Sequence, residues 1–336
     1  MKKKIFVTGS SGFIGSHLVE ELVFNGYYVK ALVPYNIDNS WGWLDNLDLS
    51  TKKNINVVMG NINDPFLLIK ETKNCDVIFH LAALISIPYS YKSPSDYIST
   101  NVVGTLNVLE AAKKNNISHF IQTSTSEVYG SAQFRPINED HPLNAQSPYA
   151  ASKIAADQLT SSYYKSFGLP VTIIRPFNTF GPRQSLRAVL PNILFQIANS
   201  DEKETIIRLG NIYSRRDFTY VSDTIQGFVK CINNKKILGE VINLGTGHDF
   251  SIQDSIRILE KITKKKFKII IENSRIRPNK SEVNLLISNN SKAKKILNWK
   301  PEFSGKKGFG YALEKTLEWF KEKKNIRSYK GLIYNV

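Results

Sequence analysis

Residues 4–15 read Lys-Ile-Phe-Val-Thr-Gly-Ser-Ser-Gly-Phe-Ile-Gly, and this stretch decides the fold class. Its first four residues form a short β pattern, and the residues after Gly15 show the apolar periodicity of a helix. The three glycines permit a tight turn and let the backbone approach a pyrophosphate at the positive helix N-terminus. The stretch therefore predicts a dinucleotide-binding unit rather than an ordinary tight turn. The residues expected at the cofactor are Gly9, Ser11, Gly12, Phe13, Ile14 and Gly15.

Strand and helix patterns alternate from this stretch to about residue 176. The expected strands span residues 28–33, 56–60, 77–81, 119–123 and 171–174. A helix is expected from about Asp96 to Asn115, and another begins near Tyr149. This alternation predicts an α/β fold with a Rossmann-type, doubly wound parallel sheet.

Beyond residue 176 the pattern is less regular. The expected elements are a helix near 188–199, a strand near 205–209, a helix from 222 to 233, a strand at 241–244 and a mixed helix-and-strand tail. Because no repeat or low-complexity linker separates them, we expect a smaller α+β substrate-binding domain interwoven with the first. The expected dinucleotide-binding domain comprises residues 1–176 plus about 217–245, and the substrate-binding domain comprises about 177–216 plus 246–336.

Further segments are expected to border the cofactor. Asn61 and Ile62 follow a strand where such folds usually place residues that touch adenine. Leu81, Ala82 and Ala83 follow another buried strand, and the small residues there let the backbone approach the cofactor. The histidine before them is expected to be structural rather than catalytic.

The end of the second predicted strand bears on the choice of cofactor. An aspartate there would bond the ribose hydroxyls of NAD, whereas an arginine would accommodate the 2′-phosphate of NADP. The sequence Val33–Asp38 has no acid at the expected place, and no Lys or Arg occurs from Val33 to Asp45. The missing cation favours NAD, and NADP stays open.

A polar loop at residues 36–47 carries two tryptophans, Trp41 and Trp43. One interpretation is that the indoles pack on the domain surface. The other is that the loop covers the adenosine end of the cofactor or contacts another subunit. The sequence leaves these interpretations open.

A second stretch, from Ser124 to Lys153, carries candidate catalytic residues. Tyr149 and Lys153 are four residues apart, so on a helix they share one face, with about 5–6 Å between their Cβ atoms. The ammonium is expected to lower the pKa of the phenol, because a nearby positive charge favours the phenolate. A phenolate near neutral pH is a general base that can take a proton from a sugar hydroxyl.

Composition argues against several other classes of protein. The net charge is +16, but the lysines are scattered and show no aromatic–arginine pattern of a nucleic-acid surface. No run approaches the roughly 18 apolar residues of a membrane span. The first apolar run is broken at Thr8 without a leader cleavage site, so we expect a cytoplasmic protein. Cys75 and Cys231 lack metal-ligand spacing, so we expect neither a metal site nor a disulfide framework.

Taken together, the motifs resemble the extended short-chain dehydrogenase/reductase family of nucleotide-sugar epimerases and dehydratases. The matching segments, in order, are the 9–15 loop, the 80–83 turn, the Asn101 helix, Tyr149 with Lys153, 175–178, Arg216-Asp217 and the Arg277 segment. They cover nearly the whole chain. The resemblance implies a nicotinamide cofactor in the larger domain and a nucleoside-diphosphate sugar held against the smaller one.

The residues Thr125-Ser126-Glu127 resemble one branch of that family. Its epimerases generally lack the acid before Val-Tyr-Gly, whereas its 4,6-dehydratases carry Thr-Asp-Glu, or Thr-Ser-Glu in the GDP-mannose dehydratases. The loop at 39–45, Asn-Ser-Trp-Gly-Trp-Leu-Asp, resembles a narrower group. These are the 4,6-dehydratases of legionaminic-acid synthesis, which act on GDP-N-acetylglucosamine.

The resemblance implies a role for each candidate catalytic residue. Tyr149, assisted by Lys153, would take the proton from the sugar's O4 while hydride leaves carbon 4, and Thr125 would hydrogen-bond the same oxygen. Glu127 would remove the proton on carbon 5, after which water would leave carbon 6 and hydride would return there. Ser126 stands where some relatives have an acidic aspartate, and we expect it to orient or relay. The product would be a 4-keto-6-deoxy sugar.

The resemblance also implies where the substrate binds. The matching positions are Asn178, Arg183, Arg216 and Arg277 at the sugar diphosphate, and Glu282 near the nucleoside ribose. Arginine suits this task because its planar fork pairs phosphate oxygens bidentately. Relatives pair through helices equivalent to residues 96–115 and 149–167, so a homo-oligomer, dimer or tetramer, is expected.

Two other functions stay open at this point. An NDP-sugar 4-epimerase would use the same Tyr-Lys pair without eliminating water. A non-catalytic regulator that binds NAD(P) could share the scaffold, but such regulators typically lose the pair, which this chain keeps.

Overall fold

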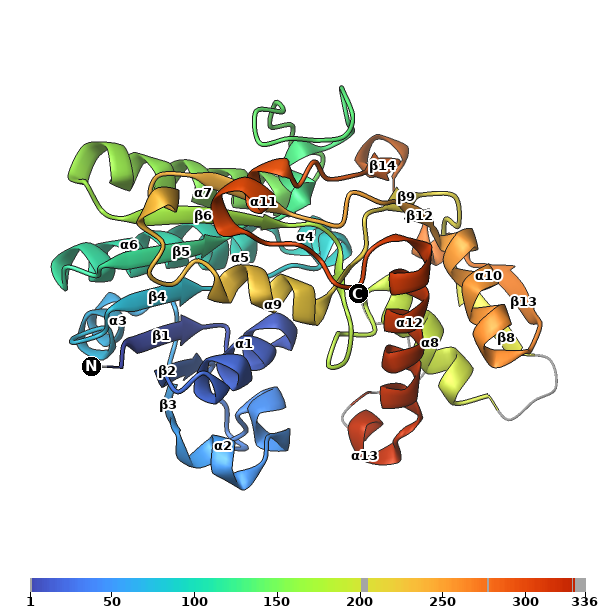
Figure 1. Ribbon diagram of the computed structural model, residues 1–336, viewed down its shortest axis with the longest axis horizontal. Helices are drawn as coiled ribbons and strands as arrows, with labels where there is room; N and C mark the ends of the chain where they lie inside the picture. The colour runs from blue at the N-terminus through green and yellow to red at the C-terminus, as the bar shows by residue number, and fades with distance from the viewer. Residues whose placement is uncertain (1, 201–204, 277, 328, 330–336) are drawn as a thin grey trace.

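Seven parallel strands form one sheet in the order β11-β6-β5-β4-β1-β2-β3 (Figure 1). The computed structural model describes residues 2–200, 205–276, 278–327 and 329. The strands are β1 (Lys4–Thr8), β2 (Tyr28–Val33), β3 (Ile55–Met59), β4 (Val77–His80), β5 (His119–Thr123), β6 (Val171–Pro176) and β11 (Val241–Leu244). Strands β1 to β6 lie in the order 3-2-1-4-5-6, which is that of dinucleotide-binding sheets. The predicted doubly wound parallel sheet is confirmed.

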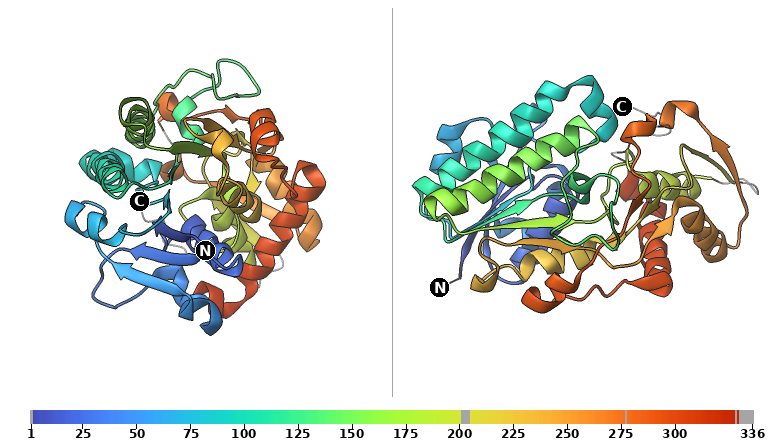
Figure 2. Two further views of the ribbon diagram at one scale, coloured as in Figure 1. Left: turned by 60° about the vertical axis from the view of Figure 1, so that its left-hand side comes forward. Right: turned by 90° about the horizontal axis from the view of Figure 1, so that it is seen from above.

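Helices cover both faces of this sheet, because alternate side chains of each strand point to opposite sides. On β1, Ile5 and Val7 pack in one core with Leu18 of the first helix, whereas Phe6 packs in a second core with Val108. The helices on the first face are α1 (Phe13–Phe24) and α9 (Val221–Val229), and those on the second are α3 (Pro65–Glu71), α6 (Gly104–Lys114) and α7 (Pro148–Phe167). Figure 2 shows α6 and α7 side by side as the outer layer.

The helix predicted from Asp96 to Asn115 forms, but it is not uniform. It consists of α5 (Pro94–Tyr97), a π-helical turn (Ile98–Val103) and α6, and a separate short helix α4 (Ile87–Lys92) precedes it. Asn101 lies in the π turn, where its amide donates to Ser152 Oγ on α7 (2.9 Å) and to the Leu84 carbonyl (2.9 Å). Such turns are common at functional sites. Here the turn ties the loop after β4 to α7.

Beside the large sheet lies a second group of short strands and helices (Figure 1). Its strands are β7 (Thr179–Phe180) with β10 (Thr219–Tyr220), β8 (Thr205–Leu209) with β13 (Phe267–Ile271), and β9 (Arg215–Arg216) between β12 (Phe250–Ser251) and β14 (Leu285–Leu286). Its larger helices are α8 (Val189–Ala198), α10 (Ile252–Thr263) and α12 (Gly305–Lys321). The two-residue strands were not predicted, because two residues carry no readable period. The domain boundaries proposed from the sequence stay a prediction.

Small helices complete the chain. They are α2 (Leu49–Lys53), α11 (Ser291–Leu297) and α13 (Lys323–Ile326). The helix predicted to reach residue 233 ends at Val229, and the chain turns at Asn233, where φ is 63°. Both cysteines carry free thiols, and Cys231 is buried in the core as a small apolar side chain. None of the helices in the described ranges has the length and apolar character that crossing a bilayer requires.

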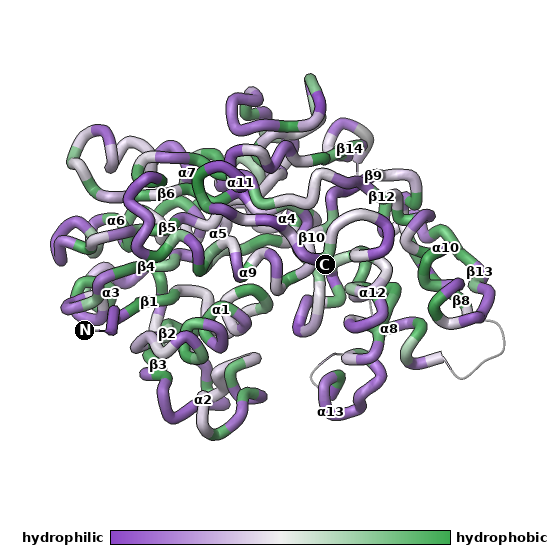
Figure 3. The backbone as a smooth tube through the Cα atoms, viewed as in Figure 1, coloured by the Kyte–Doolittle hydropathy of each residue, from purple (hydrophilic) through white to green (hydrophobic). Residues whose placement is uncertain are grey.

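An aromatic core holds the second group of elements together. Phe309 of α12 stacks on Phe218 (ring centroids 5.4 Å) and on Phe250 of β12 (4.4 Å), and it meets Phe180 edge-on (5.5 Å). Figure 3 shows the strands of the large sheet mainly in the hydrophobic colour, while the outer helices alternate between the two colours. The helices therefore bury one face and expose the other, as amphipathic helices do.

We expect Trp299→Ala to destabilise the protein by about 3–5 kcal/mol, the usual cost of removing a large buried aromatic side chain. The Trp299 side chain is fully buried, and its Nε1 donates to the Asp223 carbonyl (2.8 Å), which the substitution leaves without this donor. Urea unfolding at equilibrium measures the change. Tyr213→Ala is the control, because that ring is 74% exposed and should change stability by no more than about 0.5 kcal/mol. Equal losses in the two variants would contradict the expectation.

Candidate active site

The first two turns of α7 carry the predicted catalytic pair. Ser147 caps this helix by accepting the Ala150 amide at its hydroxyl (3.1 Å). Tyr149 and Lys153 follow on the buried side, both less than a tenth exposed. Lys153 Nζ donates to the Thr123 carbonyl at the end of β5 (2.7 Å). This bond places the ammonium at the carboxyl edge of the sheet, where α/β folds bind their ligands.

The residues after β5 approach the same phenol. The Thr125 hydroxyl lies close enough to the Tyr149 phenol to lower its pKa. The same hydroxyl accepts the Glu127 amide (3.2 Å) and so begins the short helical turn η3 (Ser126–Tyr129). Ser126 is buried, while Glu127 is partly exposed and close enough for its charge to act on Tyr149. The structure therefore brings all five predicted catalytic residues together.

Burial, not the lysine, dominates the electrostatics of the pair. Desolvation raises the pKa of Tyr149, and the negative charge of Glu127 raises it further, against the lowering effect of the Thr125 hydroxyl. Burial lowers the pKa of Lys153 to about 8, and the charge of Asp157 opposes this shift. The prediction of a phenol with a lowered pKa is wrong for the protein by itself, because the phenolate is desolvated and the ammonium is bound to a carbonyl.

The glycine loop leaves no room for side chains where it meets β4. Gly9 has a φ of +69°, and a Cβ there would lie 2.7 Å from the Ala82 amide nitrogen. A Cβ on Gly15 would lie 2.1 Å from the Gly9 carbonyl oxygen. Helix α1 begins after Gly12, which offers no side-chain cap to the first amides. Free amides in a close backbone turn fit the pyrophosphate of a dinucleotide.

The remaining predicted cofactor residues surround this loop. Leu81 and Ala82 both donate their amides to the Thr8 hydroxyl (3.1 Å each), which holds the end of β4 against β1. Ile62 is buried against α6, and a Cβ on Gly104 would lie 3.0 Å from it, whereas Asn61 is exposed. The four other predicted positions, Ser11, Phe13, Ile14 and Ala83, are all partly buried.

The tryptophan loop lies between the glycine loop and the C-terminal helix. The Trp43 amide donates to the Ser11 carbonyl (3.1 Å), and its indole meets Trp319 of α12 and Tyr329 (centroids 5.6 Å each). Trp41 is packed against the main core. Both indoles are partly buried, as the interpretation that they pack on the domain surface predicts. The interpretation that this loop covers the cofactor or meets another subunit stays a prediction.

The predicted substrate residues have different environments. Asn178 follows β6, and its side-chain oxygen is buried without a hydrogen-bond partner in the described part of the chain, which leaves an acceptor for a ligand. Arg216 and Glu282 lie together, with 3.5 Å between guanidinium and carboxylate. Arg183 instead pairs with Glu20 of α1 (2.7 Å). Arg277 lies outside the described residues.

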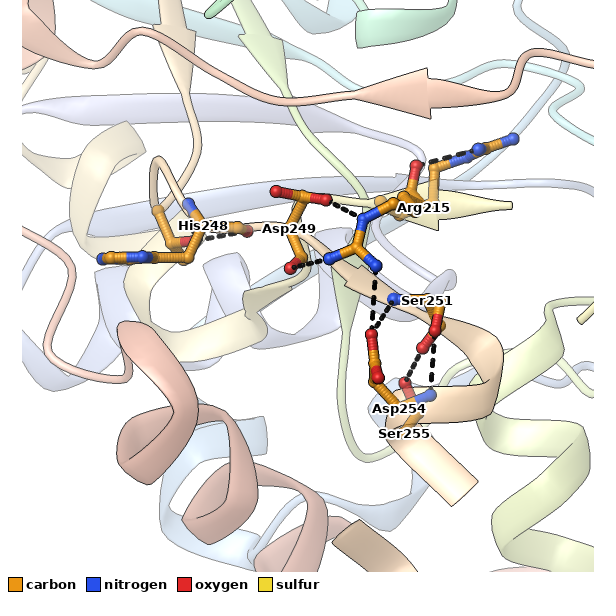
Figure 4. A network of polar contacts seen from close by, with 8 residues as sticks. Arg215, His248, Asp249, Ser251, Asp254 and Ser255 are labelled. Carbon is orange, nitrogen blue, oxygen red and sulfur yellow. Dashed lines mark hydrogen bonds and ion pairs between the residues drawn. The ribbon is translucent and has the colours of Figure 1, made fainter. Parts of the chain in front are cut away.

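A polar cluster fixes the strand that carries Arg216. Arg215, on the same strand β9, is ion-paired with Asp249 and with Asp254 of α10 (3.2 Å) (Figure 4). Asp254 also completes the reciprocal cap with Ser251 at the start of α10. These contacts join β9, β12 and α10. They leave the neighbouring Arg216 to face Glu282.

Sequence reasoning missed a buried network behind the catalytic helix. Asp157, one turn after Lys153, is ion-paired with Arg175 of β6 (3.0 Å) and accepts the Ser124 hydroxyl (2.8 Å). Arg175 also donates to the Tyr129 hydroxyl (3.0 Å). An acid at the i+4 position from the lysine was a readable signal, but its partner comes from another strand. Only the tertiary structure identifies that partner.

Comparison with known proteins shows the chemistry that this fold supports. The family model described as GDP-mannose 4,6 dehydratase matches residues 6–310. Human dTDP-D-glucose 4,6-dehydratase is 30% identical over 98% of this chain and 93% of its own. UDP-N-acetyl-alpha-D-glucosaminuronate decarboxylase from Bacillus cytotoxicus is 32% identical over 97% of this chain and 100% of its own. The structure of UDP-glucuronic acid 4-epimerase from Bacillus cereus, in complex with UDP-glucuronic acid and NAD, has a TM-score of 0.84 and 31% identity, covering 95% of this chain and 99% of that one.

We expect acid to destabilise the protein through His80. Its two ring nitrogens bond the Thr8 hydroxyl (2.8 Å) and the Thr105 hydroxyl (3.0 Å), and burial lowers its pKa from 6.5 to about 3. Between these values the unfolded chain binds the proton and the folded chain does not. The stabilisation is therefore complete above pH 6.5 and is lost as the pH falls toward 3, by about 1.4 kcal/mol per pH unit.

Urea unfolding at several pH values between about 7 and 5 measures this slope. In His80→Asn the slope should fall by the contribution of one proton relative to the unchanged protein. Identical slopes in the two proteins would show that this histidine does not carry the pH dependence.

Proposed function

The chain belongs to the family whose model is described as GDP-mannose 4,6 dehydratase, and on this premise we propose that it is a nucleotide-sugar 4,6-dehydratase. It would convert a nucleoside-diphosphate hexose to the 4-keto-6-deoxy sugar. The observation that carries the proposal is the position of Glu127. Thr125 accepts the Glu127 amide, and the Glu127 carboxylate is close enough for its charge to act on Tyr149, the group that would take the O4 proton during oxidation of carbon 4.

Tyr149 would act first as general base on the sugar's O4 proton. Thr125, whose hydroxyl lies near the phenol, would hold the same sugar oxygen. When bound, the nicotinamide supplies a hydride acceptor and, in its oxidised form, a positive charge that favours the phenolate. Lys153 contributes a second positive charge from the carboxyl end of β5. Together these charges would offset the burial that raises the pKa of Tyr149.

Glu127 would then act on carbon 5. A ketone at carbon 4 acidifies the neighbouring C–H, and a positioned carboxylate can remove that proton as general base. Loss of the carbon 6 hydroxyl needs a proton donor. Ser126 is a weak proton donor and is buried, so we assign it an orienting role. Glu127 would instead give the proton that it took from carbon 5 to the leaving hydroxyl. The two proton transfers then use one residue. Return of the hydride to carbon 6, with a proton added at carbon 5, would complete the 4-keto-6-deoxy product.

For the cofactor we propose NAD. No lysine or arginine follows β2 before Asp45 to pair with a 2′-phosphate. NAD is also the cofactor in the similar Bacillus cereus epimerase structure. The glycine loop, the ends of β3 and β4, and the pair Tyr149 and Lys153 would hold it.

For the substrate we propose a nucleotide sugar bound between the catalytic helix and the smaller group of elements. Arg216, Asn178 and Arg183 would contact the sugar diphosphate with Arg277, and Glu282 the ribose. The tryptophan loop is similar to that of enzymes acting on GDP-N-acetylglucosamine in legionaminic-acid synthesis, so we propose that substrate. By the same similarity we propose that the product is a precursor of a cell-surface glycan.

A 4-epimerase is the second candidate. It is favoured by the superposition with UDP-glucuronic acid 4-epimerase, whose TM-score is 0.84. Both reactions begin with oxidation at carbon 4, and they diverge only at the carbon 5 proton. The presence of Glu127 beside Tyr149 favours the dehydratase.

The reaction is tested by mixing the protein with GDP- and UDP-N-acetylglucosamine and analysing the products by mass spectrometry. We expect loss of one water from the GDP sugar. An unchanged mass with altered stereochemistry would favour the epimerase. In Glu127→Gln we expect oxidation to persist and dehydration to fall by about 10²–10⁴-fold, the usual contribution of a general base.

The matched variant is Tyr149→Phe, which removes the phenol hydroxyl while keeping the buried ring. Here oxidation itself should fall by a similar factor, about 10²–10⁴-fold, so neither reduced cofactor nor dehydrated sugar accumulates. If Glu127→Gln dehydrates at full rate, or Tyr149→Phe oxidises at full rate, the corresponding assignment is wrong.

We also propose that the protein pairs through the outer faces of α6 and α7, which lie side by side (Figure 2). Exposed large apolar side chains on α6, α7 and the π-helical turn before α6 are Ile98, Val103, Leu106, Tyr164 and Phe167. Light scattering should give at least twice the chain mass of 38.1 kDa, and Leu106→Glu with Phe167→Glu should give the single chain. Phe66→Glu, at an exposed site on α3, is the control and should leave the mass unchanged. A single-chain mass for the unchanged protein would contradict the proposal.

A further inference from the structure

The ion pair between Asp157 and Arg175 is unusual for its depth. Among ion pairs of the described residues it alone has both side chains less than a tenth exposed, 1% for Asp157 and 5% for Arg175. Replacing a buried pair with apolar residues is often neutral or stabilising, because removing two charges from water costs about as much as their attraction returns. Stability alone therefore does not account for this pair.

The pair lies where α7, the end of β5 and the end of β6 meet. Asp157 is on α7, two turns after Tyr149 and one turn after Lys153. Arg175 is on β6, just before the segment that leads to Asn178. Ser124, which donates to Asp157 (2.8 Å), is the residue between the Lys153 acceptor and Thr125. The carboxylate thus joins the helix of the catalytic pair to both strand ends beside it.

The carboxylate of Asp157 is only partly used by these donors. Two Arg175 nitrogens, Nη2 (3.0 Å) and Nε (3.1 Å), and the Ser124 hydroxyl all approach the same oxygen, Oδ2. Oδ1 is buried and has no hydrogen-bond partner in the described ranges. A buried oxygen without a donor keeps its field unscreened, so the charge acts on its neighbours through a medium of low dielectric constant.

That field reaches the catalytic pair. Burial lowers the pKa of Lys153, and Asp157 is the charge that opposes this shift. Arg175 in turn favours the ionised form of Asp157, whose own pKa burial raises. The other titratable groups that act on the pair from neighbouring elements are Tyr97 of α5, Glu127 of η3 and His80 of β4. Of these only Glu127 is an acid, and it faces the phenol.

We propose that Asp157 is a positioning residue for the catalytic pair. Held by Arg175 and Ser124, its carboxylate is the countercharge of the Lys153 ammonium and fixes α7 against the strand end that carries Thr125 and Glu127. Arg175 also takes part in a longer network. It donates to the Tyr129 hydroxyl, which in turn donates to the side-chain oxygen of Asn243 on β11 (2.7 Å). The inference rests on the proposed oxidation at carbon 4, in which Tyr149 and Lys153 remove the O4 proton, whichever product follows.

The test is Asp157→Asn, which removes the charge and keeps the shape. The titration of Lys153 is followed by NMR of ε-¹³C-labelled lysine, with the signal assigned by its absence in Lys153→Met. Oxidation in a single turnover is followed over pH by the absorbance of the reduced cofactor. We expect the Lys153 midpoint to fall by about one pH unit, the lower end of the effect of losing an opposite charge, because Asp157 lies one helical turn from Lys153 without forming an ion pair with it. The alkaline limit of oxidation should fall with it, while the KM for the nucleotide sugar stays unchanged.

Two further variants separate charge from folding. Asp157→Asn leaves the Arg175 charge buried without its partner, and that charge also disfavours the Lys153 ammonium. Asp157→Asn with Arg175→Gln removes both charges and should still lower the Lys153 midpoint, by less than the single variant does. Asp223→Asn is the control for loss of a buried carboxylate, because Asp223 accepts the Glu302 and Phe303 amides in the smaller group of elements. It should lower stability without moving the Lys153 midpoint.

The outcomes distinguish this inference from the proposed function. An unchanged Lys153 midpoint in both Asp157 variants overturns the inference, even if the enzyme dehydrates its substrate. If the unchanged protein oxidises no nucleotide sugar, the proposed function fails, and the NMR titration still decides whether Asp157 is the countercharge. A shifted midpoint with a matching shift in the oxidation profile supports both.

Discussion

The packing of the glycine loop on the end of β4 is the contact on which the rest of the structure depends. Gly9 approaches the backbone of Ala82 so closely that no side chain fits between them. Thr8 fills the adjacent space with its hydroxyl, which accepts two amides from the β4 end. This contact sets β1 beside β4, opens the helix N-terminus to a phosphate and aligns the carboxyl edge of the sheet.

That edge collects side chains that are far apart in sequence. Thr125 and Glu127 leave β5, Asn178 leaves β6, and Tyr149 and Lys153 lie on the helix between these strands. Parallel strands end at the same edge, so their following residues meet there. The low dielectric constant of this buried edge then makes each charge costly, as the raised pKa of Tyr149 shows. The charged neighbours of the pair are therefore part of the site.

Much of the fold was readable from local pattern. Strands β2, β5 and β11 have the predicted boundaries, because each is a buried run whose apolar residues stop abruptly. Of the candidate catalytic residues, the pair Tyr149 and Lys153 was readable because the two lie one helical turn apart, whereas Thr125, Ser126 and Glu127 were assigned by their resemblance to the family. The two-residue strands β7, β9, β12 and β14 were not readable, since their pairing depends on segments distant in sequence. In the protein by itself the pKa of Tyr149 is raised rather than lowered, because helical spacing reports proximity and not burial.

The sequence by itself determined the parallel sheet, the glycine loop and the Tyr149–Lys153 pair, because periodicity, turn chemistry and helical spacing are local properties. The tertiary structure alone decided what surrounds that pair. It placed Asp157 against Arg175 from another strand, turned Arg183 onto Glu20, and packed Trp43 on Trp319. These partners are separated by 18 to 276 residues along the chain. No local pattern specifies such contacts, because they exist only once the sheet has brought its strand ends together.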